Sequence, residues 1–164
     1  VSAVSDGVNY INRDWSDPIA LKKAAQNCYN AVGITKPLEE LDVVEIYDAF
    51  TSQHLIWYEG LGLCAPGRAG PDLIETRATS MTGKLPVNPS GGVLSNNSIG
   101  ASAMIRQAEV ALQLMGRAGD RQVANAEVGL AHGWGGAIQF HVVMIMSKEK
   151  EIQESFRKRK EKGR

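Results

Sequence analysis

Residues 88–100 have the sequence Asn-Pro-Ser-Gly-Gly-Val-Leu-Ser-Asn-Asn-Ser-Ile-Gly and lead directly into the apolar segment Ala101–Met115. Glycine and asparagine accept backbone turns that other residues resist, and small side chains let a ligand approach the main chain closely. A loop of this kind at the start of an apolar helix is where we expect chemistry or ligand contact. The alternative is a plain connecting loop.

Composition sets broad limits on the function. The 164 residues suffice for one domain with a real core, and the formal net charge is zero, so charge gives no argument for nucleic-acid binding. Residues 147–164 carry +4 and the remainder −4. No membrane-length apolar run and no cysteine or histidine spacing typical of a metal site is present. We therefore expect a cytoplasmic protein with no metal ligands, no nucleic-acid partner and no membrane span.

Hydrophobic spacing predicts the helices and strands that precede residues 88–100. Residues 18–32 have a helical pattern, with Asp17 in the capping position and Gly33 at the end. Residues 41–47 read as a strand, and Thr51 can cap a helix from residue 52 to about 61. An edge strand is plausible within residues 1–10, and residues 63–85 read as a long loop.

The segment 101–115 is apolar enough to be a helix buried on most sides, with Ile105, Ala108, Leu112 and Met115 on its main face. Residues 124–131 and 137–146 read as strands joined by a tight turn at 132–136. Within the second, residues 142–146 are continuously apolar, as expected of a central strand covered on both faces. We assign residues 1–146 to one domain and 147–164 to a charged, solvated tail.

The element order predicts an α/β fold with helices on both faces of a sheet, in a layered assembly larger than this chain. Loops at the strand ends then gather polar groups, which are Tyr47, Asp48, Asn88, Ser90, Asn97 and His132. Glycines around His132 leave it more open to a ligand than a histidine on an apolar face, with a structural role the equal alternative. His54, His141 and Cys28 are more often structural in such positions.

Four motifs in order carry a family resemblance: 42–50 (Asp-Val-Val-Glu-Ile-Tyr-Asp-Ala-Phe), 86–92 (Pro-Val-Asn-Pro-Ser-Gly-Gly), 99–101 (Ile-Gly-Ala) and 130–136 (Leu-Ala-His-Gly-Trp-Gly-Gly). Together they resemble the C-terminal half of thiolases, most of all the sterol-carrier-protein-type, lipid-transfer-protein-like branch, which includes steroid side-chain aldolases. The resemblance runs from about residue 1 to residue 146. It implies a five-layered αβαβα fold, of which this chain supplies mainly the C-terminal half.

The resemblance implies chemistry at a carbon–carbon bond beside an acyl-CoA thioester, with coenzyme A as part of the substrate and no other cofactor in this chain. The family's nucleophilic cysteine belongs to the N-terminal half, and neither Cys28 nor Cys64 matches it. The chain is thus a fragment, or it pairs with an N-terminal half or a homologous subunit in a homo- or hetero-oligomer. By the same resemblance, a small OB-fold partner carrying a zinc ribbon is implied.

Three departures from the branch affect the reaction. Tyr47 stands where most members have a histidine that helps bind the thioester oxygen, and Ala49 replaces an acid/base cysteine. Asn97 occupies the position of the histidine that would deprotonate the nucleophilic cysteine. Because asparagine does not titrate near neutrality, it cannot act as that base. His132 matches the branch.

The predicted catalytic residues are therefore Tyr47, His132 and Asn97. Around the substrate we expect Asp48, Asn88, Ser90, Gly91, Gly92, Gly135 and Gly136. The pattern favours an enzyme that performs retro-aldol cleavage of a β-hydroxyacyl-CoA, which needs no cysteine nucleophile, over thiolysis, and only together with the other half or a partner. The alternatives are a catalytically silent subunit that completes a complex, and a thiolase whose base is supplied elsewhere.

Overall fold

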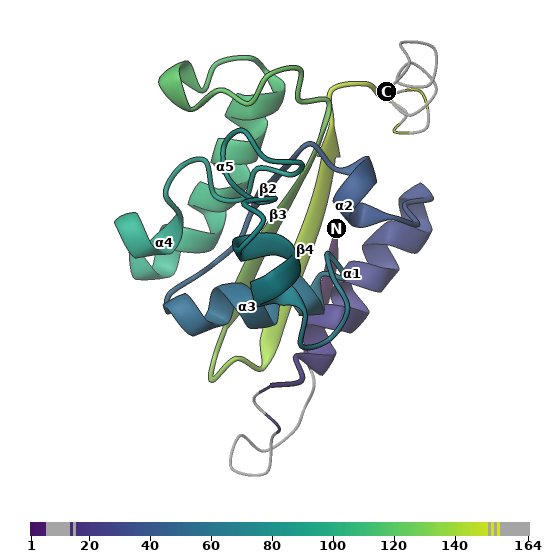
Figure 1. Ribbon diagram of the computed structural model, residues 1–164, viewed down its shortest axis with the longest axis vertical. Coiled ribbons are helices and arrows are strands. Elements are labelled where there is room, and N and C mark those ends of the chain that lie inside the picture. Colours follow the sequence, from purple (N-terminus) through teal and green to yellow (C-terminus); the bar gives the residue numbers. More distant parts are fainter. Residues whose placement is uncertain (6–13, 15, 151, 153, 155–164) are drawn as a thin grey trace.

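A four-stranded mixed sheet organises the fold in the computed structural model, which describes residues 1–5, 14, 16–150, 152 and 154. The strands are β1 (Ser2–Ser5), β2 (Val43–Glu45), β3 (Val128–Gly135) and β4 (Phe140–Ser147), in the order β1-β4-β3-β2. β2 runs parallel to β3, whereas β3 and β1 are antiparallel to β4. Figure 1 shows the sheet between α5 on one side and α1 on the other. The predicted α/β class with helices on both faces is confirmed.

Helix α5 (Ser102–Leu114) lies against one face of the sheet because β3 presents small residues there. A Cβ added at Gly129 would lie 2.5 Å from Val110 Cγ1, and one at Gly133 would lie 2.6 Å from Ala103 Cβ. Glycine at these two positions therefore allows the helix backbone to approach the strand closely.

Helices α1 (Ile19–Val32) and α3 (Thr51–Gly60) cover the other face, where Leu21, Trp57 and Leu130 belong to one buried cluster. Two expected caps are wrong. Pro18 takes the capping position of α1 while the Asp17 carboxylate pairs with Lys22 at 2.5 Å. Helix α3 already begins at Thr51, and Gln53 Oε1 accepts the Phe50 N–H at 3.3 Å.

The face of α5 that is buried differs from the expected one. Ser102, Arg106, Glu109 and Gln113 are buried, whereas Met115 is 58% exposed and Met104 72% exposed. Ala108 is exposed, and Ile105 and Leu112 are only half-buried. The expectation that this apolar face is buried is therefore wrong. On the same side of the sheet, Val142, Met144 and Met146 of β4 are also half-buried rather than covered.

Several element bounds also differ. The strand expected at residues 41–47 is confined to β2, Val43–Glu45. Strand β3 continues through His132 to Gly135, so the turn expected at 132–136 is wrong and lies at residues 136–139 instead. Residues 63–85 contain a π-helical turn, Gly70–Ile74, whose Leu73 is buried. The remaining short helices are α2 (Pro37–Glu40), α4 (Gly92–Ser95) and 3-10 turns at Ile99–Ala101 and Gly119–Arg121.

The ends of the chain are described in part. β1 confirms a strand at Ser2–Ser5, where it is an edge strand, while residues 6–10 lie outside the described part. Most of the tail also lies outside it, but Ile152 is 9% exposed and packs in the main core, so this residue is not solvated. In the portion that the structure describes, no helix combines the length and apolarity needed to cross a membrane.

Candidate active site

Asn88 attaches the loop that follows it to the end of β2. The segment before it pairs with the strand: Val44 N–H donates to the Pro86 carbonyl at 3.0 Å and Asn88 N–H to the Val44 carbonyl at 2.8 Å. Asn88 then turns into the left-handed region (φ 52°), and its side-chain Oδ1 accepts the Ile46 N–H at 2.7 Å. The amide side chain thus continues the strand pairing after the backbone has turned away.

Asp48 and Gly92 hold the middle of the loop. The Asp48 side chain is almost fully buried, and its Oδ1 accepts the Val93 N–H at 2.6 Å. A Cβ at Gly92 would overlap both Asp48 carboxylate oxygens and Asn88 Nδ2. Gly91 and Gly92 have φ of 89° and 67°, which favours glycine at both positions. The structure thus brings together the predicted residues Asp48, Asn88, Gly91 and Gly92.

Ser90 is fixed by a buried ion pair that the sequence analysis missed. Glu45 accepts hydrogen bonds from Ser90 N at 3.0 Å and Ser90 Oγ at 2.8 Å, and Arg106 Nη1 donates to Glu45 Oε2 at 2.8 Å and to Ser90 Oγ at 2.7 Å. Burial raises the pKa of Glu45 to about 7, against the opposing effect of Arg106 and Ser90. The sequence offered only an arginine within an apolar helix and an acidic residue within a strand, and nothing local pairs the two.

Asn97 has a defined orientation at the start of the following helix. Its Oδ1 accepts the Ile99 N–H at 3.0 Å and the Ser102 Oγ–H at 2.8 Å. Because the carbonyl oxygen is occupied, the Nδ2 amino group is the end that can donate to a ligand. Ile99 beside it has φ 47° and is 78% exposed, which is a strained conformation for a β-branched residue.

Tyr47 is held by two tryptophans. Its carbonyl accepts Trp57 Nε1–H at 2.8 Å and Trp134 Nε1–H at 2.9 Å, and its ring centroid lies 5.1 Å from that of Trp134. These bonds join the end of β2 to α3 and to the end of β3. The predicted residues Gly135 and Gly136 lie at that same end of β3, where it enters the turn to β4.

His132 is not open to a ligand in this chain, so that expectation is wrong. It lies inside β3 and is 1% exposed, with Nε2 3.0 Å from Nδ1 of His141 and the two rings stacked. His141 Nε2 lies 3.2 Å from the Ile138 carbonyl, which can only accept, so His141 Nε2 carries a proton. Burial, with a smaller contribution from His141, lowers the pKa of His132 well below its usual value. His132 is therefore a neutral core histidine.

His54 is brought to the loop although its helical position indicated a structural role. Its Nε2 lies 3.1 Å from Asp48 Oδ2 and 3.4 Å from Asn88 Nδ2, and its side chain is 25% exposed. The available signal was the six-residue spacing from Asp48, which places the helix directly after the strand that carries the carboxylate.

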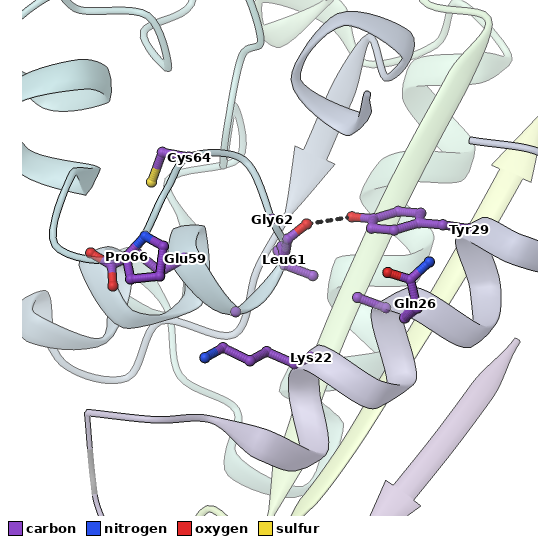
Figure 2. A pocket seen from close by; sticks show the side chains of 10 residues that line it. Lys22, Gln26, Tyr29, Glu59, Leu61, Gly62, Cys64 and Pro66 are labelled. Atoms are coloured by element: carbon purple, nitrogen blue, oxygen red, sulfur yellow. Dashed lines mark hydrogen bonds between the residues drawn. The ribbon is translucent and has the colours of Figure 1, made fainter. Parts of the chain in front are cut away.

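A separate groove of about 330 Å³ lies between α1 and the end of α3 (Figure 2). Tyr29 Oη donates to the Leu61 carbonyl at 2.8 Å beneath it, and Cys64 lies on its rim. Burial first, then Glu59 and Asp72, raise the pKa of Cys64 to about 11. Cys64 is therefore a thiol at neutral pH, as is the buried Cys28, whose pKa burial also raises, and neither suits a nucleophile's role.

Comparisons with known proteins show what this chain is similar to. Human sterol carrier protein 2 is 42% identical over 120 residues, which are 71% of this chain and 21% of that protein. Acetyl-CoA acetyltransferase of Methanothermobacter thermautotrophicus is 36% identical over 137 residues, covering 83% of this chain and 35% of the enzyme. The chain thus spans between a fifth and about a third of these relatives.

A solved structure of the Ltp2-ChsH2(DUF35) aldolase has the same fold, with a TM-score of 0.72 and 21% identity over 91% of this chain and 39% of that one. Residues 3–148 match the family model described as thiolase C-terminal domain-like. The match includes β1–β4, α5 and the whole of the loop around Asn88 and Asn97. The chain therefore belongs to the thiolase superfamily and corresponds to its C-terminal domain-like half.

Proposed function

We propose that this chain is part of an acyl-CoA enzyme that cleaves the carbon–carbon bond of a β-hydroxyacyl-CoA by a retro-aldol reaction. The observation that carries the proposal is the orientation of Asn97, whose Oδ1 is bound to Ile99 and Ser102 and whose amino group is left to donate. A donor that cannot titrate suits the stabilisation of a thioester enolate and does not suit activation of a cysteine.

The reaction balances without a nucleophile on this chain. A base removes the proton of the β-hydroxyl, the Cα–Cβ bond breaks, and its electron pair passes into the thioester as an enolate. The β-carbon leaves as an aldehyde or ketone, and protonation of the enolate carbon gives the shortened acyl-CoA. Asn97 Nδ2–H donates to the thioester oxygen as negative charge develops there. Tyr47 is the predicted residue whose phenol can return a proton.

The active assembly requires a second half, and we propose an N-terminal thiolase half or a homologous subunit as its source. On the apolar side of α5, Met104, Ala108 and Met115 are exposed and Ile105 is half-buried. Val142, Met144 and Met146 of β4, on the same side of the sheet, are also half-buried. This chain matches only 39% of the aldolase chain with the same fold. The rest of such a chain is available to cover this face. A zinc-ribbon OB-fold subunit and a cytoplasmic location remain further parts of this proposal.

The test uses the assembled enzyme, with both halves, and a β-hydroxyacyl-CoA. We expect release of the carbonyl product and of the shortened acyl-CoA with no added CoA, and at least a hundredfold loss of kcat in Asn97→Ala. Cleavage that depends on added CoA would replace the retro-aldol proposal by thiolysis.

One observation favours a catalytically silent subunit as the second candidate function. His132, which matches the branch, is buried and neutral, and so lacks access to a ligand in this chain. This candidate predicts no turnover of β-hydroxyacyl-CoA or of 3-ketoacyl-CoA by the complete assembly, while the subunits still associate.

A further inference from the structure

Helix α5 has a buried polar face along its length. Ser102, Arg106, Glu109 and Gln113 are each at most 5% exposed, and their spacing of three to four residues places them on one side of the helix. Each of the four side chains hydrogen-bonds to a segment outside the helix. The polar face therefore connects α5 to the segments around it.

The first turn of this polar face holds both ends of the loop at residues 88–100. Arg106 Nη1 donates to Ser90 Oγ at 2.7 Å, near the start of the loop. Ser102 Oγ donates to Asn97 Oδ1 at 2.8 Å, near its end. Because Ser102 and Arg106 lie about one helical turn apart, a single turn of α5 relates the position of Asn97 to that of Ser90.

The orientation of the Asn97 amide follows from its two hydrogen-bond partners. The Ile99 N–H, 3.0 Å away, can only donate, so the atom that faces it is Oδ1 and not Nδ2. The Ser102 hydroxyl lies 2.8 Å from the same oxygen and must therefore donate to it as well. Asn97 is exposed, so its Nδ2 amino group is available to a ligand.

The two donors to Asn97 differ in how firmly they are held. Ile99 is 78% exposed and has φ 47°. Ser102 is fully buried at the first position of α5, and the next residue, Ala103, packs on β3, where a Cβ added at Gly133 would lie 2.6 Å from Ala103 Cβ. A donor on a packed helix fixes a side chain more precisely than a donor in an exposed turn.

We propose that Ser102 is a positioning residue for Asn97. The inference rests on the proposed function, in which Asn97 Nδ2–H donates to the thioester oxygen. By occupying Oδ1, the buried Ser102 hydroxyl keeps the amino group in one orientation before the enolate forms. A donor that is already in place requires no reorganisation during the reaction. Without this hydroxyl the amide retains only the Ile99 N–H, and its donor is less precisely placed.

The first experiment measures binding and needs no turnover. The assembled enzyme is titrated with a saturated acyl-CoA, which lacks the β-hydroxyl, and with the S-alkyl-CoA thioether of the same chain length, which lacks the thioester oxygen. We expect the wild type to bind the thioester about fivefold or more tightly than the thioether, and this preference to fall below about twofold in Ser102→Ala. Asn97→Asp should also lose the preference, because its carboxylate accepts the Ile99 and Ser102 hydrogen bonds but cannot donate. An unchanged preference in Ser102→Ala would overturn the inference.

The second experiment measures turnover of a β-hydroxyacyl-CoA. For Ser102→Ala we expect kcat to fall by about five- to fiftyfold, with KM changed by less than about threefold. In the Asn97→Ala background the same substitution should lower kcat by less than about twofold, because the amide through which Ser102 acts is already absent. Fully additive losses would mean that Ser102 acts by another route, and they would remove the inference.

Gln113 provides the control on the same buried face of α5. Its Nε2 donates to the Arg121 carbonyl at 2.7 Å, and its Oε1 accepts the Val123 N–H at 2.7 Å, both away from the loop. Gln113→Ala should lower the denaturant midpoint, measured by circular dichroism, yet keep the thioester preference and kcat within about twofold of wild type. A loss of preference equal to that of Ser102→Ala would mean that general loosening of α5 causes the effect, against the inference.

The two proposals fail differently. An active wild-type assembly in which Ser102→Ala keeps both kcat and the thioester preference removes Ser102 as a positioning residue and leaves the retro-aldol function standing. A wild-type assembly without turnover removes the proposed function, and the ratio of the two Kd values then decides by itself whether Ser102 orients Asn97 toward a bound thioester.

Discussion

Gly92 is the residue around which the candidate site is packed. It has φ 67°, and an added Cβ would overlap the Asp48 carboxylate and Asn88 Nδ2. We expect Gly92→Ala to lose stability by about 1–3 kcal/mol from the unfavourable φ alone, with a further loss from the displaced carboxylate. Urea unfolding monitored by circular dichroism measures this change.

Gly100 provides the matched control for that substitution. It stands in the same loop region, lacks a positive φ, and has no atom within 4 Å of an added Cβ. Gly100→Ala should therefore leave the free energy of unfolding within about 0.5 kcal/mol of wild type. Equal losses for the two variants would show that the packing of Asp48 and Asn88 around Gly92 is unimportant.

His132 should make stability depend on pH. Burial lowers the pKa of His132 well below its usual value, so it stays neutral in the folded chain, while the unfolded chain takes up a proton below about pH 6.5. The unfolded state then binds more protons, and stability is lost as the pH falls below that value. The expected slope is about 1.4 kcal/mol per pH unit for one proton.

Urea unfolding between pH 5 and 7.5 checks this slope against His132→Gln. The variant lacks the titrating group. The slope of its unfolding free energy against pH should therefore be smaller by the contribution of about one proton, whatever its stability at pH 7. Parallel pH profiles for the two proteins would mean that His132 is protonated in the folded state.

Individual side chains show where sequence reasoning stops. The residues around Asn88 and Gly92 were found because glycine and asparagine mark tight turns in the sequence itself. His132 was assigned the wrong environment, because a strand that continues by a few residues turns a histidine expected in a turn toward the core. The strand β3 extends past His132, which places its imidazole against His141 and Trp57.

At the scale of an element, α5 joins the sheet to the loop through its polar side. Arg106 is 2% exposed and pairs with Glu45 of β2 and with Ser90. At a pH well above 7, where Glu45 is ionised, Arg106→Met would leave the Glu45 carboxylate buried without a countercharge, at an expected cost of about 3–5 kcal/mol. The double variant Glu45→Gln with Arg106→Met should recover much of that loss, because no charge then remains buried.

The exposed pair between Arg68 and Asp72 is the control for this ion pair. Arg68→Met should barely alter the denaturant midpoint, since solvent screens such pairs. A loss for Arg106→Met as small as that for Arg68→Met would mean that the Glu45 site is already satisfied without the arginine.

The elements show the same division between what could and could not be predicted. Periodicity located α1, α3 and α5 to within a few residues, because hydrophobic spacing is a local property. The face that α5 buries could not be predicted from hydrophobic spacing, since Ser102, Arg106 and Gln113 are buried while Met104 and Met115 are exposed. The Glu45–Arg106 contact joins residues 61 apart in the sequence, so no local pattern indicates it.

At the scale of the whole molecule, the uncovered face formed by α5 and β4 is the main unusual feature. Its members lie on one side of the sheet, because Val142 pairs with Gly133 and Met144 with Ala131, and Gly133 faces Ala103 of α5. Met115 and Met146 line a common pocket there. Apolar side chains gathered on one side of a fold in this way are typical of an association surface.

Charge placed on this face should prevent association and leave the chain folded. Met104 is 72% exposed, so Met104→Glu changes no buried contact within the chain and should keep the unfolding free energy within about 0.5 kcal/mol of wild type. In the complex the same carboxylate would be buried without a partner, so affinity for the N-terminal half should fall at least a hundredfold. Ile74→Glu is the control and should bind normally, because Ile74 is 46% exposed and follows Leu73, which packs in the main core cluster with α1 and α3. Analytical ultracentrifugation of the two co-expressed halves separates these outcomes, and normal association of Met104→Glu would place the partner on another surface.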